Sequence, residues 1–207
     1  KYVWGSEETQ YFFKLNPEAI LDAIDAVGFK TTGRCLPLNS IENRVYEIEI
    51  DRPESEIKSP SDNFIVAKFY RPGRWTKEQI RDEHDFLNDL VEAEVPVIPP
   101  LNIDGETLFE MPDHKILYCL YEKRGGRNPE EMNEEQLEIM GRSLARIHSV
   151  GALKAAKHRI KLTPESYGEA NLNYLKSTDY IPADIRESFI TICDQIIRES
   201  KPLFENM

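Results

Sequence analysis

Apolar and polar positions alternate with both strand and helix periods up to about residue 125 and with a helix period after it. Asn16 and Pro17 can open a helix that Gly28 closes, with apolar residues three and four positions apart between them. Thr76 and Gln79 form a capping pair that opens a second helix, which ends before residue 96. Short segments rich in β-branched and aromatic residues predict strands at residues 33–38, 45–50, 64–70, 107–109 and 116–121.

The rest of the chain has a helical pattern. Apolar residues recur at helical spacing from about residue 133 to 151 and again from about 183 to 196. We therefore expect an α+β chain, with a strand-rich part at residues 1–124 and a helical part at residues 125–207. The glycine pair Gly125-Gly126 marks the predicted boundary.

Composition narrows the function classes. The 207 residues include 26 basic and 37 acidic ones, and the net charge of −11 argues against non-specific nucleic-acid binding. No apolar run approaches the roughly 18 residues that a membrane-spanning helix needs, so no membrane partner is expected. The three cysteines are widely spaced and the N-terminus resembles no signal peptide, which together predict a cytoplasmic protein.

Two charged residues stand at positions that the pattern predicts to be buried. Lys68 lies inside the apolar segment 64–70, and Glu83 falls on the apolar seam of the following helix. Kinases hold ATP phosphates with a strand lysine that a helix carboxylate orients, at a comparable spacing. Two structural alternatives remain: Lys68 could extend to solvent from an edge strand, and Glu83 could be one of several acids in residues 82–85.

The predicted hairpin before Lys68 has a polar turn. Kinases cover the nucleotide phosphates with a glycine-rich hairpin. Here the turn contains no glycine and offers Asn39, Ser40 and Asn43, which tolerate tight turns and provide side-chain donors. Taken alone, such a turn is also typical of an ordinary hairpin.

Several ordered motifs are similar to those of the bacterial stress response kinase A family of Ser/Thr protein kinases. They are Pro37-Leu38-Asn39-Ser40-Ile41-Glu42-Asn43-Arg44-Val45-Tyr46, Val66-Ala67-Lys68-Phe69-Tyr70-Arg71-Pro72-Gly73-Arg74-Trp75, Glu83-His84-Asp85-Phe86 and Gly141-Arg142-Ser143-Leu144-Ala145-Arg146-Ile147-His148. The resemblance implies a protein-kinase-like fold of the aminoglycoside-phosphotransferase and choline-kinase type. Residues 1–124 would then form an antiparallel-sheet nucleotide-binding lobe with one helix of the αC type. Residues 125–207 would form the first helices of an incomplete C-terminal lobe.

The resemblance also implies roles for individual residues. Lys68 would be the phosphate-binding lysine and Glu83 its catalytic partner on the helix. ATP would further be bound by the turn, by residues flanking the base, and by the backbone of the hinge between lobes. These residues are Asn39, Ser40 and Asn43 for the turn, Val45 and Ala67 for the base, and Tyr121, Glu122, Lys123 and Arg124 for the hinge.

The chain departs from the family in one respect. The family's catalytic loop has the form His-Gly-Asp followed by Asn, and no His-Gly-Asp occurs in these 207 residues. Together with Lys1 in place of an initiating Met, this absence predicts a fragment that is inactive alone. Mg²⁺ ligands are expected beyond Met207, with none in this chain. A truncated lobe should expose apolar surface and associate with itself.

Three functional hypotheses follow. The first is an ATP- and Mg²⁺-dependent stress-response kinase that phosphorylates Ser or Thr on proteins and is a monomer when complete. The second is a small-molecule alcohol kinase of the same fold, of the aminoglycoside, choline or homoserine type. The third is a non-catalytic nucleotide-binding module.

Overall fold

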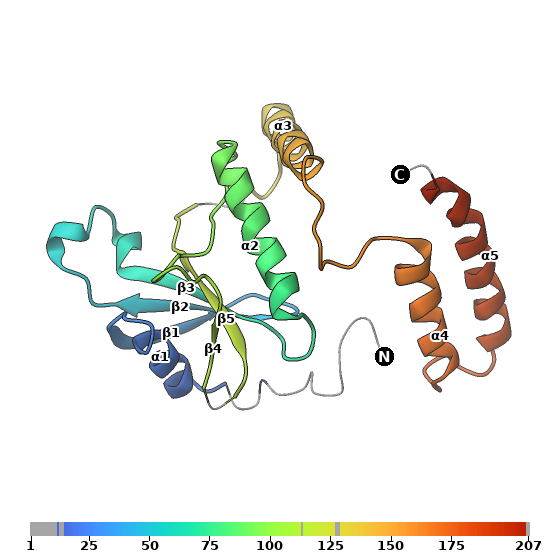
Figure 1. Cartoon of the computed structure of the whole chain (residues 1–207), viewed down its shortest axis with the longest axis horizontal. Coiled ribbons are helices and arrows are strands. Elements are labelled where there is room, and N and C mark those ends of the chain that lie inside the picture. The colour runs from blue at the N-terminus through green and yellow to red at the C-terminus, as the bar shows by residue number, and fades with distance from the viewer. Residues whose placement is uncertain (1–11, 13–14, 113, 127–128, 206–207) are drawn as a thin grey trace. The chain divides into compact units, whose positions relative to one another are not determined.

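The computed structural model describes residues 12, 15–112, 114–126 and 129–205 (Figure 1). Two compact units emerge: the described residues up to His158 form one, and residues from Arg159 onward form the other. The predicted lobe boundary at residue 125 concerns the kinase-like fold and stays a prediction. No helix in the described part of the chain has the length and apolar character needed to cross a membrane.

The first unit is built on one antiparallel sheet of five strands. The strands are β1 (Thr31–Leu38), β2 (Arg44–Ile50), β3 (Phe64–Phe69), β4 (Phe109–Glu110) and β5 (Leu117–Glu122). Their order is β1-β2-β3-β5-β4, so β3 lies at the centre. Val45 pairs with Lys68 on β3, which pairs in turn with Cys119 on β5. The predicted α+β class is confirmed.

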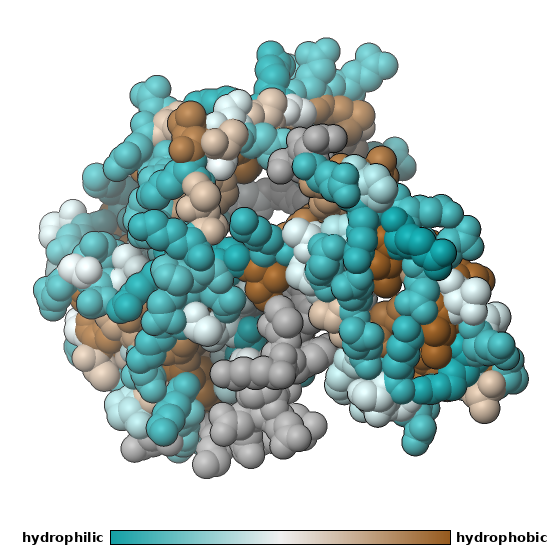
Figure 2. Space-filling model, turned by 45° about the vertical axis from the view of Figure 1, so that its right-hand side comes forward, coloured by the Kyte–Doolittle hydropathy of each residue, from teal (hydrophilic) through white to brown (hydrophobic). Residues whose placement is uncertain are grey.

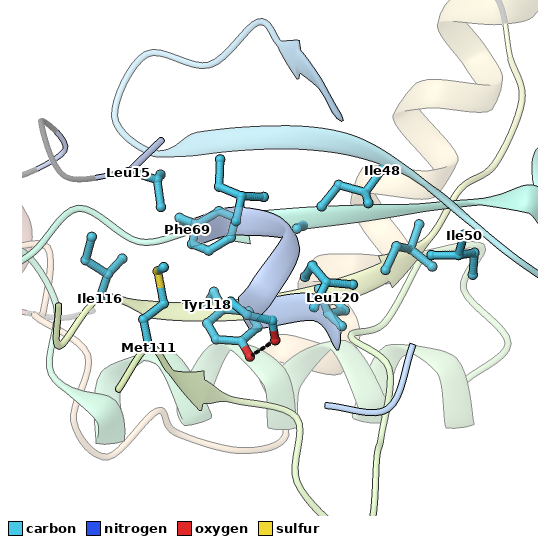
Figure 3. Close-up of a cluster of buried hydrophobic side chains, with 13 residues drawn as sticks. Leu15, Ile48, Ile50, Phe69, Met111, Ile116, Tyr118 and Leu120 are labelled. Carbon is cyan, nitrogen blue, oxygen red and sulfur yellow. Dashed lines mark hydrogen bonds between the residues drawn. The ribbon is translucent and has the colours of Figure 1, made fainter. Parts of the chain in front are cut away.

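Helix α1 (Pro17–Asp25) covers one face of this sheet. Asn16 caps its first turn by accepting a 2.8 Å hydrogen bond from the backbone N–H of Ala19. Ile20 and Ile24 are fully buried. They belong to the cluster of buried apolar side chains that Figure 3 shows in part. The Tyr118 hydroxyl donates to the carbonyl of Ala23 at 2.7 Å, which fixes the helix on β5. The buried cluster consists of Leu15, Ile20, Ala23, Ile24, Ile48, Ile50, Ile65, Ala67, Phe69, Met111, Ile116, Tyr118 and Leu120.

Helix α2 (Lys77–Glu92) packs on the other face. Thr76 and Gln79 form the predicted capping box, each side chain accepting from the other residue's backbone N–H. Ile80 is buried with Tyr70 and Cys119, which point away from the α1 side of the sheet. Side chains alternate between faces along a strand, so the two helices cover the sheet from opposite sides.

Helix α3 (Glu134–Gly151) follows the sheet and has no buried residue. Arg146 donates to the carbonyls of Ala93 and Glu94 at 3.0 and 2.8 Å, beyond the C-terminal end of α2. The apolar stripe of α3 is exposed to solvent: the exposed fractions of Leu137, Met140 and Leu144 are 51%, 40% and 49%.

The second unit is helical. It contains a π-helical turn η4 (Pro164–Glu169), α4 (Ala170–Lys176) and α5 (Arg186–Phe204). Lys176 binds Asp194 at 3.1 Å and ties α4 to α5. A Cβ on Gly168 would lie 2.8 Å from Cγ1 of Ile197, so η4 and α5 approach closely. Figure 2 shows apolar side chains, in brown, at the surface of the molecule among polar ones. The exposed apolar residues of α5 include Ile192 and Ile196.

Most predicted elements are confirmed, with three corrections. The strand predicted at residues 107–109 is Phe109–Glu110, because Thr107 faces His84 from a bend instead of joining the sheet. Helix α5 extends past the predicted end to Phe204 and includes Pro202. Residues 152–163 are not helical, and neither η4 nor α4 was predicted.

Candidate active site

Lys68 and Glu83 form an ion pair between the sheet and α2. Lys68 Nζ lies 2.7 Å from Glu83 Oε1, and the side chains are only 21% and 23% exposed. Strand β3 is central, so the alternative of an edge-strand lysine does not hold. The neighbouring acid Asp82 instead accepts a 2.6 Å hydrogen bond from the His158 backbone N–H. Glu83 is therefore the acid that pairs with Lys68, and the roles inferred for the two residues stay predictions.

A chain of uncharged side chains supports Glu83 from within the unit. The Tyr70 hydroxyl donates to Glu83 Oε1 at 3.4 Å and lies 3.2 Å from His84 Nε2. The other ring nitrogen, His84 Nδ1, lies 2.8 Å from the Thr107 hydroxyl. Because the Tyr70 hydroxyl donates its one proton to the carboxylate, His84 Nε2 must donate to Tyr70, and His84 Nδ1 then accepts from Thr107. Each donor then points toward the negative charge.

Burial keeps the side chains around Glu83 uncharged. His84 is 2% exposed, and burial lowers its pKa to about 4. Burial also raises the pKa values of Tyr70 and Cys119 above their ordinary ranges. At neutral pH the carboxylate therefore faces neutral groups, and Lys68 is held by Glu83 and by the Tyr70 ring, whose centroid is 4.5 Å from Nζ.

An apolar surface adjoins Lys68 on the same face of the sheet. Leu38, Val45 and Lys68 form one row of paired residues, and Leu36, Glu47 and Val66 form the next. Leu36 and Leu38 are 44% and 40% exposed, so this surface is open to a ligand. Among the described residues the sheet thus presents an apolar area directly beside a fixed positive charge.

Ala67 lies elsewhere. It is fully buried in the cluster beneath α1, on the face opposite to Lys68. Strand alternation places Val66 on the Lys68 face, and applying that rule to the sequence would have identified Val66 as the candidate.

The turn residues have different surroundings. Asn39 is exposed and Ser40 half-buried. The Asn43 side chain accepts a 3.3 Å hydrogen bond from the backbone N–H of Arg71, so it fastens the turn to the chain after β3.

The predicted hinge begins inside β5. Tyr121 and Glu122 are strand residues, and Lys123 and Arg124 follow the strand. Lys123 binds Glu47 at 2.6 Å on the Lys68 face of the sheet. Lys68 and Lys123 therefore lie on the same face of the sheet as Leu38, Val45 and Val66.

A separate cavity of about 500 Å³ lies against α2, and neither Lys68 nor Glu83 lines it. Its walls include Asp82, Asp89, Lys154 and His158, and Lys154 binds Asp89 at 3.1 Å. No local pattern signals this cavity, because it depends on where the chain after α3 returns to α2.

Comparisons with known proteins find related sequences and related folds. A model of the phosphotransferase enzyme family (APH) matches residues 34–199. The chain is 34% identical over 187 residues to stress response kinase A of Shigella flexneri and of Escherichia coli (strain K12). It is 33% identical over 186 residues to serine/threonine protein kinase RdoA of Salmonella typhimurium. Each alignment covers 90% of this chain and 53% of the relative, so the chain spans about half the length of these curated relatives.

Two solved structures share the fold. Amicoumacin kinase hAmiN, in complex with AMP-PNP, Ca²⁺ and Ami, superposes with a TM-score of 0.62 at 18% identity, covering 88% of this chain and 52% of that one. A microcompartment-associated aminopropanol kinase gives a TM-score of 0.54 at 18% identity, covering 73% and 46%. The protein-kinase-like α+β fold is thus shared with small-molecule kinases.

Proposed function

Because the chain belongs to the phosphotransferase enzyme family, we propose that it holds ATP for a stress-response Ser/Thr protein kinase. The observation that carries the proposal is the Lys68–Glu83 ion pair at 2.7 Å, beside an open apolar surface. Phosphoryl transfer depends mainly on positioning and charge neutralisation. A lysine fixed by a carboxylate presents a positive charge at a defined place, which is what nucleotide phosphates require.

The remaining residues support the same proposal. Leu36, Leu38, Val45 and Val66 would contact the base, with Val66 taking the role first expected of Ala67. The backbone of residues 121–124 would pair with the base edge, and the turn at Asn39, Ser40 and Asn43 would cover the phosphates. Glu83 would orient Lys68 and leave its remaining N–H groups to donate to phosphate oxygens.

Mg²⁺ is proposed as the partner ion of ATP. No group of three or more His, Cys, Asp or Glu side chains able to hold a metal occurs among the residues that the structure describes. We therefore assign no metal ligand to these residues and derive no step through the ion. The chain's own part is to bind and orient the nucleotide.

A small-molecule alcohol is the second candidate acceptor. An amicoumacin kinase and an aminopropanol kinase are among the solved structures that share the fold. The relative named serine/threonine protein kinase RdoA favours a protein acceptor, since it shares 33% of residues with this chain against 18% for these structures. We propose transfer assays with casein and with amino alcohols on the protein that carries this chain. Transfer to amino alcohols alone would replace the first candidate with the second.

Nucleotide titration tests the proposal directly. AMP-PNP binding would be measured by calorimetry for the wild type, Lys68→Ala and the control Lys77→Ala. Lys77 also pairs with a carboxylate, Glu110 at 2.5 Å, but on the surface. We expect Lys68→Ala to weaken binding at least about tenfold, as for a lost charge-assisted contact, and Lys77→Ala to leave it unchanged. Equal affinity of the wild type and Lys68→Ala would refute the proposal.

A further inference from the structure

Glu42, in the turn between β1 and β2, is bound by two side chains from the loop after β3. Arg74 Nε donates to Glu42 Oε2 at 3.0 Å, and Trp75 Nε1 donates to Glu42 Oε1 at 2.9 Å. Each carboxylate oxygen thus receives its own donor. The Arg74 guanidinium also lies 4.8 Å from the centroid of the Trp75 ring, so the two donors support each other.

A second contact fastens the same turn. Asn43 accepts from the backbone N–H of Arg71, the third residue after Lys68. The turn and the loop meet because Arg44 pairs with Phe69, which places both at one end of the sheet. Residues 39–43 are all described, and none has a positive φ or is glycine. The turn therefore adopts ordinary backbone angles and is held by side-chain contacts.

The carboxylate of Glu42 is charged in this arrangement. Partial burial would raise its pKa, but the hydrogen bonds from Trp75 and Arg74 and the charges of Arg74 and Arg71 hold the pKa below its usual range. The contact with Arg74 is thus a charge-assisted hydrogen bond, which is stronger than a neutral one. Arg74 is only 16% exposed, so solvent screens this ion pair less than an open surface pair.

We propose that Glu42 is a positioning residue that clamps the turn over the nucleotide phosphates. The inference rests on the proposed function, because it assumes that this turn covers ATP. Glycine-rich turns acquire their shape through backbone freedom, whereas here the Glu42 clamp holds the turn in place before the nucleotide arrives. Preorganisation of this kind reduces the ordering cost of binding. Its effect should fall on phosphate contacts and leave base contacts unchanged.

The first test measures the clamp without nucleotide. Amide hydrogen exchange of residues 39–43 would be followed in the wild type, Glu42→Gln, Trp75→Phe and the control Glu49→Gln. Glu49 lies on β2 of the same hairpin, with a side-chain exposure of 32% against 35% for Glu42. We expect exchange about tenfold faster in Glu42→Gln, which loses the charge, and faster exchange in Trp75→Phe, which loses the N–H. Exchange unchanged in both variants would overturn the inference.

The second test compares two ligands. AMP-PNP carries phosphates and adenosine does not. Glu42→Gln should weaken AMP-PNP binding about tenfold and leave adenosine binding unchanged, while Glu49→Gln changes neither. Equal weakening of both ligands would indicate general damage and overturn the inference, and so would faster exchange with unchanged AMP-PNP affinity. A wild-type chain that bound neither ligand would instead remove the proposed function itself, and the two failures are therefore distinguishable.

Discussion

Acid should destabilise the first unit through His84, and the His84→Gln variant isolates this effect. The imidazole is buried between Tyr70 and Thr107, with both ring nitrogens in hydrogen-bond contact. Burial is the largest influence and opposes protonation of the ring, as do Lys68 and Arg81. Together they outweigh Glu83 and Asp85, which favour protonation. The ring therefore stays neutral in the folded protein at pH values where it would be charged in the unfolded chain.

The size and the sign of this pH effect on the free energy of unfolding follow from the linkage between proton binding and folding. The folded pKa of His84 is about 4 and its ordinary value is 6.5. Between these pH values the unfolded chain binds a proton that the folded chain does not, so the free energy of unfolding decreases as pH falls. The stabilisation is fully present above pH 6.5 and is lost progressively toward pH 4. A shift of this size corresponds to roughly 3 kcal/mol.

Urea unfolding at a series of pH values measures the effect. The carboxylates with lowered pKa values, such as Glu42, act below their ordinary value of 4.5, so the interval from pH 7 to 4.5 reports mainly on His84. We expect the wild type to lose about 2–3 kcal/mol over this interval and His84→Gln to lose much less. The control His148→Gln, at an exposed position on α3, should follow the wild type. Parallel curves for the wild type and His84→Gln would refute the reasoning.

Three further predictions concern packing. Thr107→Val leaves a buried His84 nitrogen without its partner and should lower the free energy of unfolding by about 1–3 kcal/mol in urea titrations. Gly168→Ala should destabilise the second unit by about 1–3 kcal/mol, because the added Cβ has no room. Gly141→Ala should stabilise α3 by about 0.5–1 kcal/mol, because the space around Gly141 is open. Thermal melts of the two variants and the wild type measure both effects. The open stripe on α3 should make the chain self-associate in sedimentation velocity, and Leu144→Lys should reduce this association.

The parts of the fold that depend on local pattern were predictable from the sequence. The alternation in β2, the apolar segment of β3 and the capping box at Thr76 each determine an element through neighbouring residues alone. Lys68 and Glu83 were found because a charge at a buried position needs a partner. Helix spacing then left Glu83 as the acid facing the sheet.

Contacts between distant segments were not predictable in the same way. Thr107 meets His84 only because the chain before β4 passes α2, and nothing local to residue 107 signals this. Ala67 lies on the face opposite to Lys68 because strand alternation separates adjacent residues, and a resemblance in residue order does not show this. The role proposed for Glu42 depends on its contacts with Arg74 and Trp75, which lie more than 30 residues away in another loop.

The candidate site is organised by one continuous segment, residues 68–83. Lys68 begins it, Arg74 and Trp75 in its middle hold the turn through Glu42, and Glu83 near its end returns to bind Lys68. The loop that fixes the turn is therefore also the connection that sets where α2 starts. A change in this loop would displace the turn and Glu83 together, so the phosphate-covering turn and the Lys68–Glu83 pair should respond jointly to variants at Trp75. If a Trp75 variant changed amide exchange in the turn without changing the nucleotide affinity that depends on Lys68, or the reverse, the turn and the Lys68–Glu83 pair would be held separately.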